Sequence, residues 1–185
     1  MKKILMILLV SIFSLTMLAD GSTNYKEGDI IFIISKSSQS KYIQYATKSL
    51  WSHCGIVVYK NKQPYVLEAS NVVKLTPLNT FIAKGRGSLS VQCRYTEKPI
   101  KINYKNYLGI PYDSQFSLTN NKYYCSELVW IIYKNQLGVK LCEPQPLTSY
   151  NTFGLSKLLK KRGISKKSKF VAPSDLLNSD KLYGV

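Results

Sequence analysis

Residues 123–138 read YYCSELVWIIYKNQLG and predict a buried helix that begins at a cysteine. Ser126 and Glu127 suit the first turn of a helix, and Lys134 suits the last. Gly138 is a typical residue for a C-terminal cap. Three β-branched residues in this stretch would also suit a strand, but the run is much longer than a typical strand of about 5–6 residues. We therefore expect a helix of about four turns.

The residues before this helix predict a sheet of short antiparallel strands. Apolar or β-branched segments, separated by turns or helices, are found at 28–34, 52–59, 64–69, 72–75 and 88–95. Short helices are expected at residues 39–48 and 78–84. The polar residues 60–63 join two of the strands into a hairpin. Because there is no repeat and no long linker, we expect one α+β domain over residues 22–185.

Cys125 stands where a thiolate would be stabilised. The first-turn amides of a helix have no partner inside the helix, and the helix dipole favours negative charge there. The amides of Cys125 and Ser126 could lower the pKa of the thiol and hold the oxyanion of a tetrahedral intermediate. Three other cysteines lack this setting: Cys54, Cys93 and Cys142. The alternative is that Cys125 is simply a small buried apolar residue.

His53 is the single histidine of the chain, and it shares the predicted hairpin with Glu68. An imidazole exchanges a proton near pH 7, so a thiol mechanism would need this residue. A turn at residues 60–61 sets His53 opposite Glu68, and a turn at 61–62 makes them diagonal neighbours. Both registers put the two side chains on the same side of the sheet, and Cys54 should point to the opposite side. The alternatives are a structural histidine and a glutamate that lies in water on an edge strand.

The chain is strongly basic. It has 185 residues, with 26 lysines and arginines, 10 acidic residues and a formal net charge of +16. So few carboxylates exclude a carboxylate-rich calcium or magnesium site, and without CxxC or HxxxH spacing an ordinary zinc site is not expected. Residues 154–170 carry seven basic residues, no acid and an apolar face of Leu155, Leu158 and Leu159. This segment is either solvated surface or a contact for anionic polymers or lipid headgroups, and no motif indicates nucleic acid.

Residues 1–21 predict a cleaved signal peptide, because two lysines precede an apolar run that small residues follow. The run is short and contains serine and threonine, so an uncleaved anchor is the less favoured alternative. We expect an exported protein, periplasmic or secreted, with no stable membrane span after cleavage. In an oxidising compartment four cysteines could form two disulfides in any of three pairings. A catalytic Cys125 would leave only Cys54, Cys93 and Cys142 to pair.

Several short motifs together resemble one enzyme family. They are Gly28-Asp29-Ile30-Ile31, Ser52-His53-Cys54-Gly55-Ile56-Val57, Leu67-Glu68-Ala69, Pro111-Tyr112-Asp113 and Tyr124-Cys125-Ser126-Glu127-Leu128-Val129. This combination is similar to the permuted papain-like amidases, the YiiX/YaeF-like relatives of the NlpC-type cell-wall peptidases. The order His, Glu, Cys is the permuted one, because ordinary papain-like enzymes place the cysteine first. The resemblance spans roughly residues 27–138 and implies an antiparallel sheet or partial barrel packed against the helix of the nucleophile.

The resemblance also implies roles for the site residues. Cys125 would be the nucleophile, His53 the base and then the acid, and Glu68 the group that orients the imidazole. The backbone amides of Cys125 and Ser126 would hold the oxyanion. Two tyrosines would line the site without a catalytic role: Tyr112 and Tyr124. This mechanism needs no metal and no organic cofactor.

Three hypotheses follow for the function. The leading one is an exported cysteine hydrolase that cleaves an amide through a thioester, in a cell-envelope peptide such as a peptidoglycan stem peptide. A second keeps the same residues but acts on a lipid ester, as a hydrolase or acyltransferase, because relatives with a similar permuted core act on lipids. A third is a non-catalytic envelope-binding protein whose Cys125 is in a disulfide.

Overall fold

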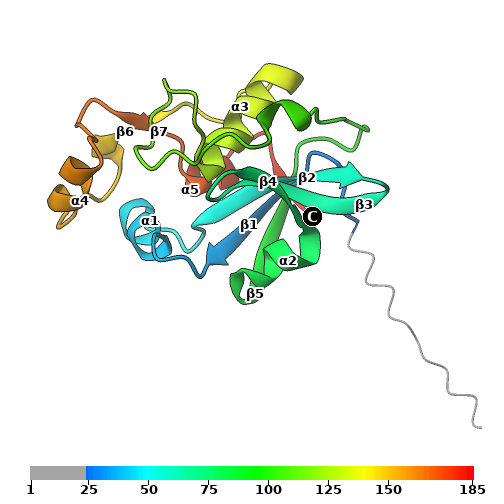
Figure 1. Cartoon of the computed structure of the whole chain (residues 1–185), viewed down its shortest axis with the longest axis horizontal. Coiled ribbons are helices and arrows are strands. Elements are labelled where there is room, and N and C mark those ends of the chain that lie inside the picture. Colours follow the sequence, from blue (N-terminus) through cyan, green and yellow to red (C-terminus); the bar gives the residue numbers. More distant parts are fainter. Residues whose placement is uncertain (1–23) are drawn as a thin grey trace, which may run out of the picture.

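The computed structural model describes residues 24–185, and the predicted signal peptide, residues 1–21, lies outside them. The main sheet contains β1 (Ile30–Ser35), β2 (His53–Lys60), β3 (Gln63–Ala69), β4 (Val73–Pro77), β5 (Gly85–Arg94) and β8 (Tyr183–Gly184). Its strand order is β4-β3-β2-β1-β5-β8, and every neighbouring pair is antiparallel (Figure 1). The expected α+β class with an antiparallel sheet is therefore confirmed.

The helices and a second, small sheet surround the main one. The helices are α1 (Ser40–Thr47), α2 (Leu78–Ala83), α3 (Cys125–Leu137), α4 (Ser156–Lys161) and α5 (Pro173–Leu177). Single 3₁₀ turns lie at Lys105–Tyr107 and Leu147–Ser149, and the small sheet pairs β6 (Gln145–Pro146) with β7 (Lys169–Phe170). The predicted helix and strand segments are confirmed to within about three residues at each end, the usual scatter of such boundaries. No helix of residues 24–185 is both long enough and apolar enough to cross a membrane.

The hydrophobic core lies on both faces of the sheet. α3 packs mainly on β2, and its buried side chains Leu128, Val129 and Ile132 contact the larger core cluster. On the other face, Phe81 of α2 packs in a smaller cluster with apolar residues of β1, β2 and β3. The packing of α3 on the sheet sets Cys125, its first residue, beside the start of β2.

The hairpin of β2 and β3 has the second of the two registers considered above. Asn61 and Lys62 form the turn, both with positive φ (52° and 60°), and Lys60 pairs with Gln63. Two such residues give a hairpin turn whose twist matches that of the strands. The residue pairs that follow in this register make His53 and Glu68 diagonal neighbours.

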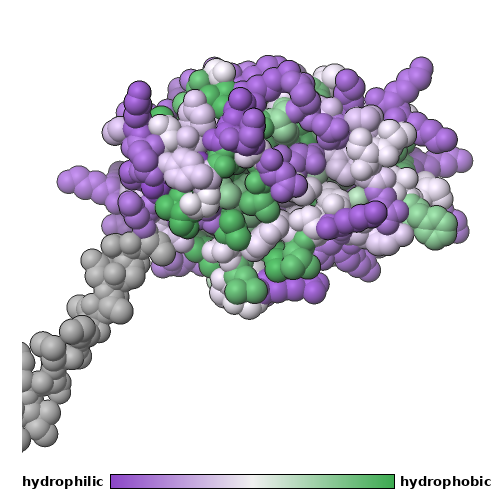
Figure 2. All heavy atoms as spheres, turned by 180° about the vertical axis from the view of Figure 1, so that it is seen from behind, coloured by the Kyte–Doolittle hydropathy of each residue, from purple (hydrophilic) through white to green (hydrophobic). Residues whose placement is uncertain are grey.

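Two helices lie at the end of the molecule away from the β2–β3 hairpin, α1 and α4 (Figure 1). Hydrogen bonds between serines connect α1 to the sheet. The Ser40 and Ser52 hydroxyls lie 2.6 Å apart, and the Ser35 amide donates to the Ser52 hydroxyl at 3.0 Å. The segment before α4 is tied to α1, because the Asn151 amide donates to the Ala46 carbonyl at 2.8 Å. Figure 2 shows the opposite face, where hydrophobic residues form separate patches among hydrophilic ones.

All four cysteines of the chain are free thiols. Cys54, Cys93 and Cys125 are buried, and Cys142 is half-buried. The structure therefore contains neither two disulfides nor a pair among the three cysteines other than Cys125.

Candidate active site

The side chains of His53 and Glu68 are in direct contact. The imidazole Nε2 lies 2.7 Å from the Glu68 Oε2, where an Nε2 proton is donated to the carboxylate. The Phe81 ring packs against the imidazole with ring centroids 5.4 Å apart. Because this contact occupies Nε2, the other ring nitrogen, Nδ1, is the one left for Cys125.

Glu68 is fully buried, which excludes the alternative of an edge-strand glutamate in water. β3 lies between β2 and β4, and the other carboxylate oxygen accepts hydrogen bonds from the Thr76 hydroxyl and the Lys84 ammonium. Burial alone would raise the pKa of this carboxyl, but the hydrogen bonds from His53, Lys84 and Thr76 lower it to about 2. Sequence reasoning missed Thr76 and Lys84, because only the pairing of β4 and the packing of α2 bring them to Glu68.

Gly55 leaves the space that Glu68 and its strand need beside β2. A Cβ atom at this position would lie 2.7 Å from the Leu67 carbonyl oxygen and 2.4 Å from the Val66 Cγ1. Both distances are below a normal van der Waals contact. A side chain here would force β3 away from the histidine strand.

Cys125 is the first residue of α3, as predicted, and is only 3% exposed. Among the described residues, neither its amide nor the Ser126 amide donates a hydrogen bond. The Ser126 hydroxyl donates to the Val171 carbonyl at 2.6 Å, and the Tyr124 amide donates to the Glu127 carboxylate at 3.3 Å. These contacts fix the start of the helix, so the two amides can serve an oxyanion.

Cys54 contacts Cys125, although its side chain points away from His53. That side of β2 is the one that α3 covers. A hydrogen bond from the Cys54 thiol is the largest influence on the Cys125 thiol, and burial opposes it. Together with the charge of His53 and its hydrogen bond, it holds the pKa of Cys125 well below its usual value. The sequence placed Cys54 on the correct side of the strand but missed this contact.

The imidazole is correspondingly held in its charged form. Burial lowers the pKa of His53, but the Cys125 thiolate and then the Glu68 carboxylate outweigh it and raise the pKa to about 9. The low pKa of the thiol and the raised pKa of the imidazole favour a thiolate–imidazolium pair at neutral pH.

Two cavities meet at Cys125. The first, which we call the polar cleft, is lined by His53, Glu68, Ser70, Asn71, Tyr112 and three lysines: Lys36, Lys74 and Lys84. The second, the apolar groove, lies between α1, α4 and the start of α3 and is lined by Ile43, Phe116, Tyr124, Leu155, Leu158 and Leu159. Cys125 borders both cavities, whereas His53 borders only the polar cleft. Tyr112 lines the polar cleft, and Tyr124 lines the apolar groove.

Residues 24–185 match the family described as permuted papain-like amidase enzymes (YaeF/YiiX, C92 family). The chain belongs to this family. It is 46% identical over 134 residues to the uncharacterized protein YiiX of Escherichia coli (strain K12), an alignment that covers 67% of this chain and 65% of YiiX. It is also similar to a crystal structure of yiiX from Escherichia coli O157:H7, with 40% identity, a TM-score of 0.79 and coverage of 86% of this chain and 96% of that one. Membership confirms the resemblance seen in the sequence and implies a papain-like cysteine amidase or peptidase.

The yiiX crystal structure is described as that of a metalloprotein. In the present chain, residues 24–185 contain no group of three or more His, Cys, Asp or Glu side chains placed to hold a metal ion. The one histidine already bonds Glu68. The residues of this site therefore do not fit an ordinary metal centre.

Proposed function

We propose that the protein is a cysteine hydrolase that cleaves an amide through a thioester intermediate. Cys125 is the nucleophile, His53 the acid and base, and Glu68 the group that orients the imidazole and stabilises its charge. The observation that supports this most strongly is the hydrogen bond between Glu68 and His53 in the polar cleft, which Cys125 at the start of α3 also lines.

Each step uses groups that the site supplies. The Cys125 thiolate attacks the amide carbonyl, and the carbon–sulfur bond forms as the oxyanion develops near the amides of Cys125 and Ser126. When the carbon–nitrogen bond breaks, His53 gives its Nδ1 proton to the leaving amine. Water then attacks the thioester, His53 takes a proton from it, and the acid departs as the thiolate is restored. Glu68 keeps the Nε2 proton in place throughout.

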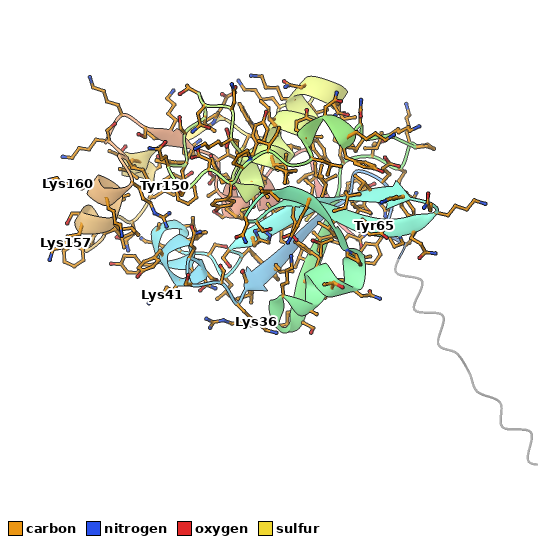
Figure 3. The ribbon with its side chains drawn as sticks, viewed as in Figure 1. Lys36, Lys41, Tyr65, Tyr150, Lys157 and Lys160 are labelled. Atoms are coloured by element: carbon orange, nitrogen blue, oxygen red, sulfur yellow. The ribbon has the colours of Figure 1, made fainter. Side chains whose placement is uncertain are left out.

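We further propose that the enzyme is exported, periplasmic or secreted, and acts on an amide of the cell envelope, such as a peptidoglycan stem peptide. The signal-like residues 1–21 and the net charge of +16 support this setting. Lys157 and Lys160 extend outward from α4 (Figure 3). They suit contact with an anionic polymer or a lipid surface, rather than with nucleic acid.

A lipid ester is the second candidate substrate, because the apolar groove beside Cys125 suits a hydrocarbon chain. The same three residues would act as a hydrolase or an acyltransferase. A purely binding role is less well supported, because that hypothesis places Cys125 in a disulfide and the thiol is free.

The first test is the rate of iodoacetamide labelling of Cys125 against pH, followed by peptide mapping. We expect an apparent pKa well below the ~8.5 of a free thiol, and we expect His53→Ala to abolish the fast labelling. Slow, equal labelling of all four cysteines would contradict the proposal. Hydrolysis of peptidoglycan fragments and of phospholipid vesicles by the wild type, with Cys125→Ala as the inactive control, then separates the peptide and lipid substrates.

A further inference from the structure

The end of the molecule formed by α1 and α4 has a surface without negative charge. The sequence contains no aspartate or glutamate at residues 30–67 or 144–174, which include both helices. Exposed lysines lie on both helices and in the loops beside them: Lys41, Lys48, Lys157, Lys160, Lys161, Lys166 and Lys167. Lys41, Lys157 and Lys160 are seen at this end in Figure 3. We call the exposed surface of residues 41–50 and 153–167 the basic end, and it attracts a partner of negative charge.

The leucines of α4 are not part of this exposed surface. Leu155, Leu158 and Leu159 are half-buried and turn inward, where they line the apolar groove. An amphipathic helix that lies in a lipid interface on its own turns its apolar face outward. α4 instead turns its lysines outward, so the hydrophobic part of any surface contact must come from other residues.

Two hydrophobic side chains beside the lysines supply such a contact. Among the described residues, the large hydrophobic side chains with the greatest exposed fractions are Phe153 at 84% and Leu50 at 65%. Phe153 precedes α4, and Leu50 follows α1. In Figure 2, which shows the molecule from behind, a hydrophobic patch lies among hydrophilic side chains at the right-hand end. Leaving both side chains in water is unfavourable, so the basic end suits a partner with an apolar layer.

Hydrogen bonds hold the segments of Phe153 and Leu50 near the same end of α1. The Asn151 amide donates to the Ala46 carbonyl at 2.8 Å, which sets the chain just before Phe153 against the last turn of α1. The Gln44 side-chain amide donates to the Leu50 carbonyl at 2.7 Å. The two hydrophobic side chains therefore belong to one surface, which also carries the lysines of α1 and α4.

We propose that the basic end docks on the surface of a bilayer that contains anionic phospholipid. The lysines contact the phosphates of the headgroups, and Phe153 and Leu50 enter the layer beneath them. A soluble anionic polymer offers phosphates but no apolar layer for these two side chains, so the bilayer fits the surface better. The inference goes beyond the proposed function, because it selects one partner and uses none of the residues of the active site.

The test measures cosedimentation of the protein with vesicles of phosphatidylcholine alone or with about 30% phosphatidylglycerol. The chain is expressed from residue 22, because the apolar N-terminal run would itself bind lipid. The sheet, the core and the family match all lie within residues 24–185. We expect binding to the anionic vesicles to be at least about tenfold tighter than binding to phosphatidylcholine.

Paired substitutions separate the charge of this surface from the net charge of the protein. Lys157→Gln with Lys160→Gln should weaken binding to anionic vesicles about 25-fold, since each lysine near such a surface contributes about fivefold. This loss should shrink as the salt concentration rises. The matched control is Lys60→Gln with Lys62→Gln, which removes the same charge from exposed positions of the β2–β3 hairpin at the other end of the molecule (Figure 1). The control should change binding little.

Substitution of Phe153 tests the hydrophobic part of the contact. Phe153→Ser should weaken binding about tenfold at low and high salt alike, whereas Phe153→Trp should retain it. Binding that Phe153→Ser leaves unchanged and that soluble polyphosphate abolishes would overturn the inference and indicate an anionic polymer as the partner. No binding to the anionic vesicles, or equal losses from the two pairs of lysine substitutions, would also overturn it.

These outcomes are independent of the proposed function. Iodoacetamide labelling of Cys125 is measured without vesicles, and Cys125→Ala should bind vesicles as the wild type does. Loss of vesicle binding with fast labelling of Cys125 would overturn the docking surface alone. Vesicle binding with slow labelling would support the docking surface and contradict the proposed function.

Discussion

Replacement of Glu68 by glutamine tests the charge relationships of the site most directly. Glu68→Gln removes one negative charge and keeps the size and a hydrogen-bond acceptor at the position 2.7 Å from the imidazole. With the charge centres roughly 4 Å apart and an effective dielectric constant of about 20, the lost attraction is about 4 kcal/mol. That corresponds to about 3 pKa units, since one unit is about 1.4 kcal/mol. The pKa of His53 should therefore fall from about 9 toward a value near 6.

The consequence for activity depends on pH. At pH 7.5 an imidazole with a pKa of about 6 is only about 3% protonated, so the supply of imidazolium should fall roughly 30-fold. Above pH 7.5 the difference in activity between the variant and the wild type should grow. The alkaline limb of the rate profile should move from about pH 9 in the wild type to about pH 6 in the variant. The assay measures the rate of hydrolysis of an amide substrate across pH 5–10, together with the labelling rate of Cys125.

The matched control is Glu143→Gln, because Glu143 is a largely exposed carboxylate that pairs only with Lys140 among the described residues. This variant should keep the wild-type profile. If Glu68→Gln folds normally and its alkaline limb stays where the wild type has it, the assignment of Glu68 as the charge partner of His53 is refuted.

The same substitution should change stability with a defined sign. The folded-state pKa of Glu68 is depressed to about 2 from an ordinary value of about 4.5. Its ionised form therefore stabilises the fold above pH 4.5, by up to about 3 kcal/mol, and the contribution is lost as the pH falls through 2. Urea unfolding should show Glu68→Gln less stable than the wild type at pH 7, with the gap closing toward pH 2. An equal difference in the free energy of unfolding between the two proteins at pH 7 and pH 2 would contradict this linkage.

Three further substitutions test other contacts. Cys54→Ala removes a thiol donor to Cys125 and should raise the pKa of Cys125, so that labelling of this thiol needs a higher pH. Cys54→Ser, which keeps a donor, should change the labelling profile less. Gly55→Ala should lower the free energy of unfolding by at least about 2 kcal/mol, since the added methyl group meets β3; an unchanged urea midpoint would contradict the close approach. Arg94→Met should lower the free energy of unfolding by about 3–5 kcal/mol, because it leaves the buried Asp29 carboxylate without its bidentate ion pair at 2.8 and 2.9 Å. A decrease below about 1 kcal/mol in urea unfolding would contradict the importance of this ion pair.

The sequence alone determined the local elements and part of the site. The helix that begins at Cys125 follows from its length, its first-turn residues and the glycine that ends it. His53 and Glu68 lie on the same side of the sheet because side chains alternate along a strand, and both registers considered gave this result. These features depend on spacing within one segment, or within two segments joined by a short turn.

Only the tertiary structure decided what surrounds those residues. The turn at Asn61 and Lys62 selected the diagonal register, and the packing of α3 on β2 brought Cys54 against the Cys125 thiol. Lys84 reaches Glu68 because α2 packs on the face of the sheet that carries the glutamate. The apolar groove exists because α1 and α4, more than 100 residues apart in the chain, lie beside the start of α3. Such contacts depend on how distant segments pack, and no local spacing in the sequence specifies that packing.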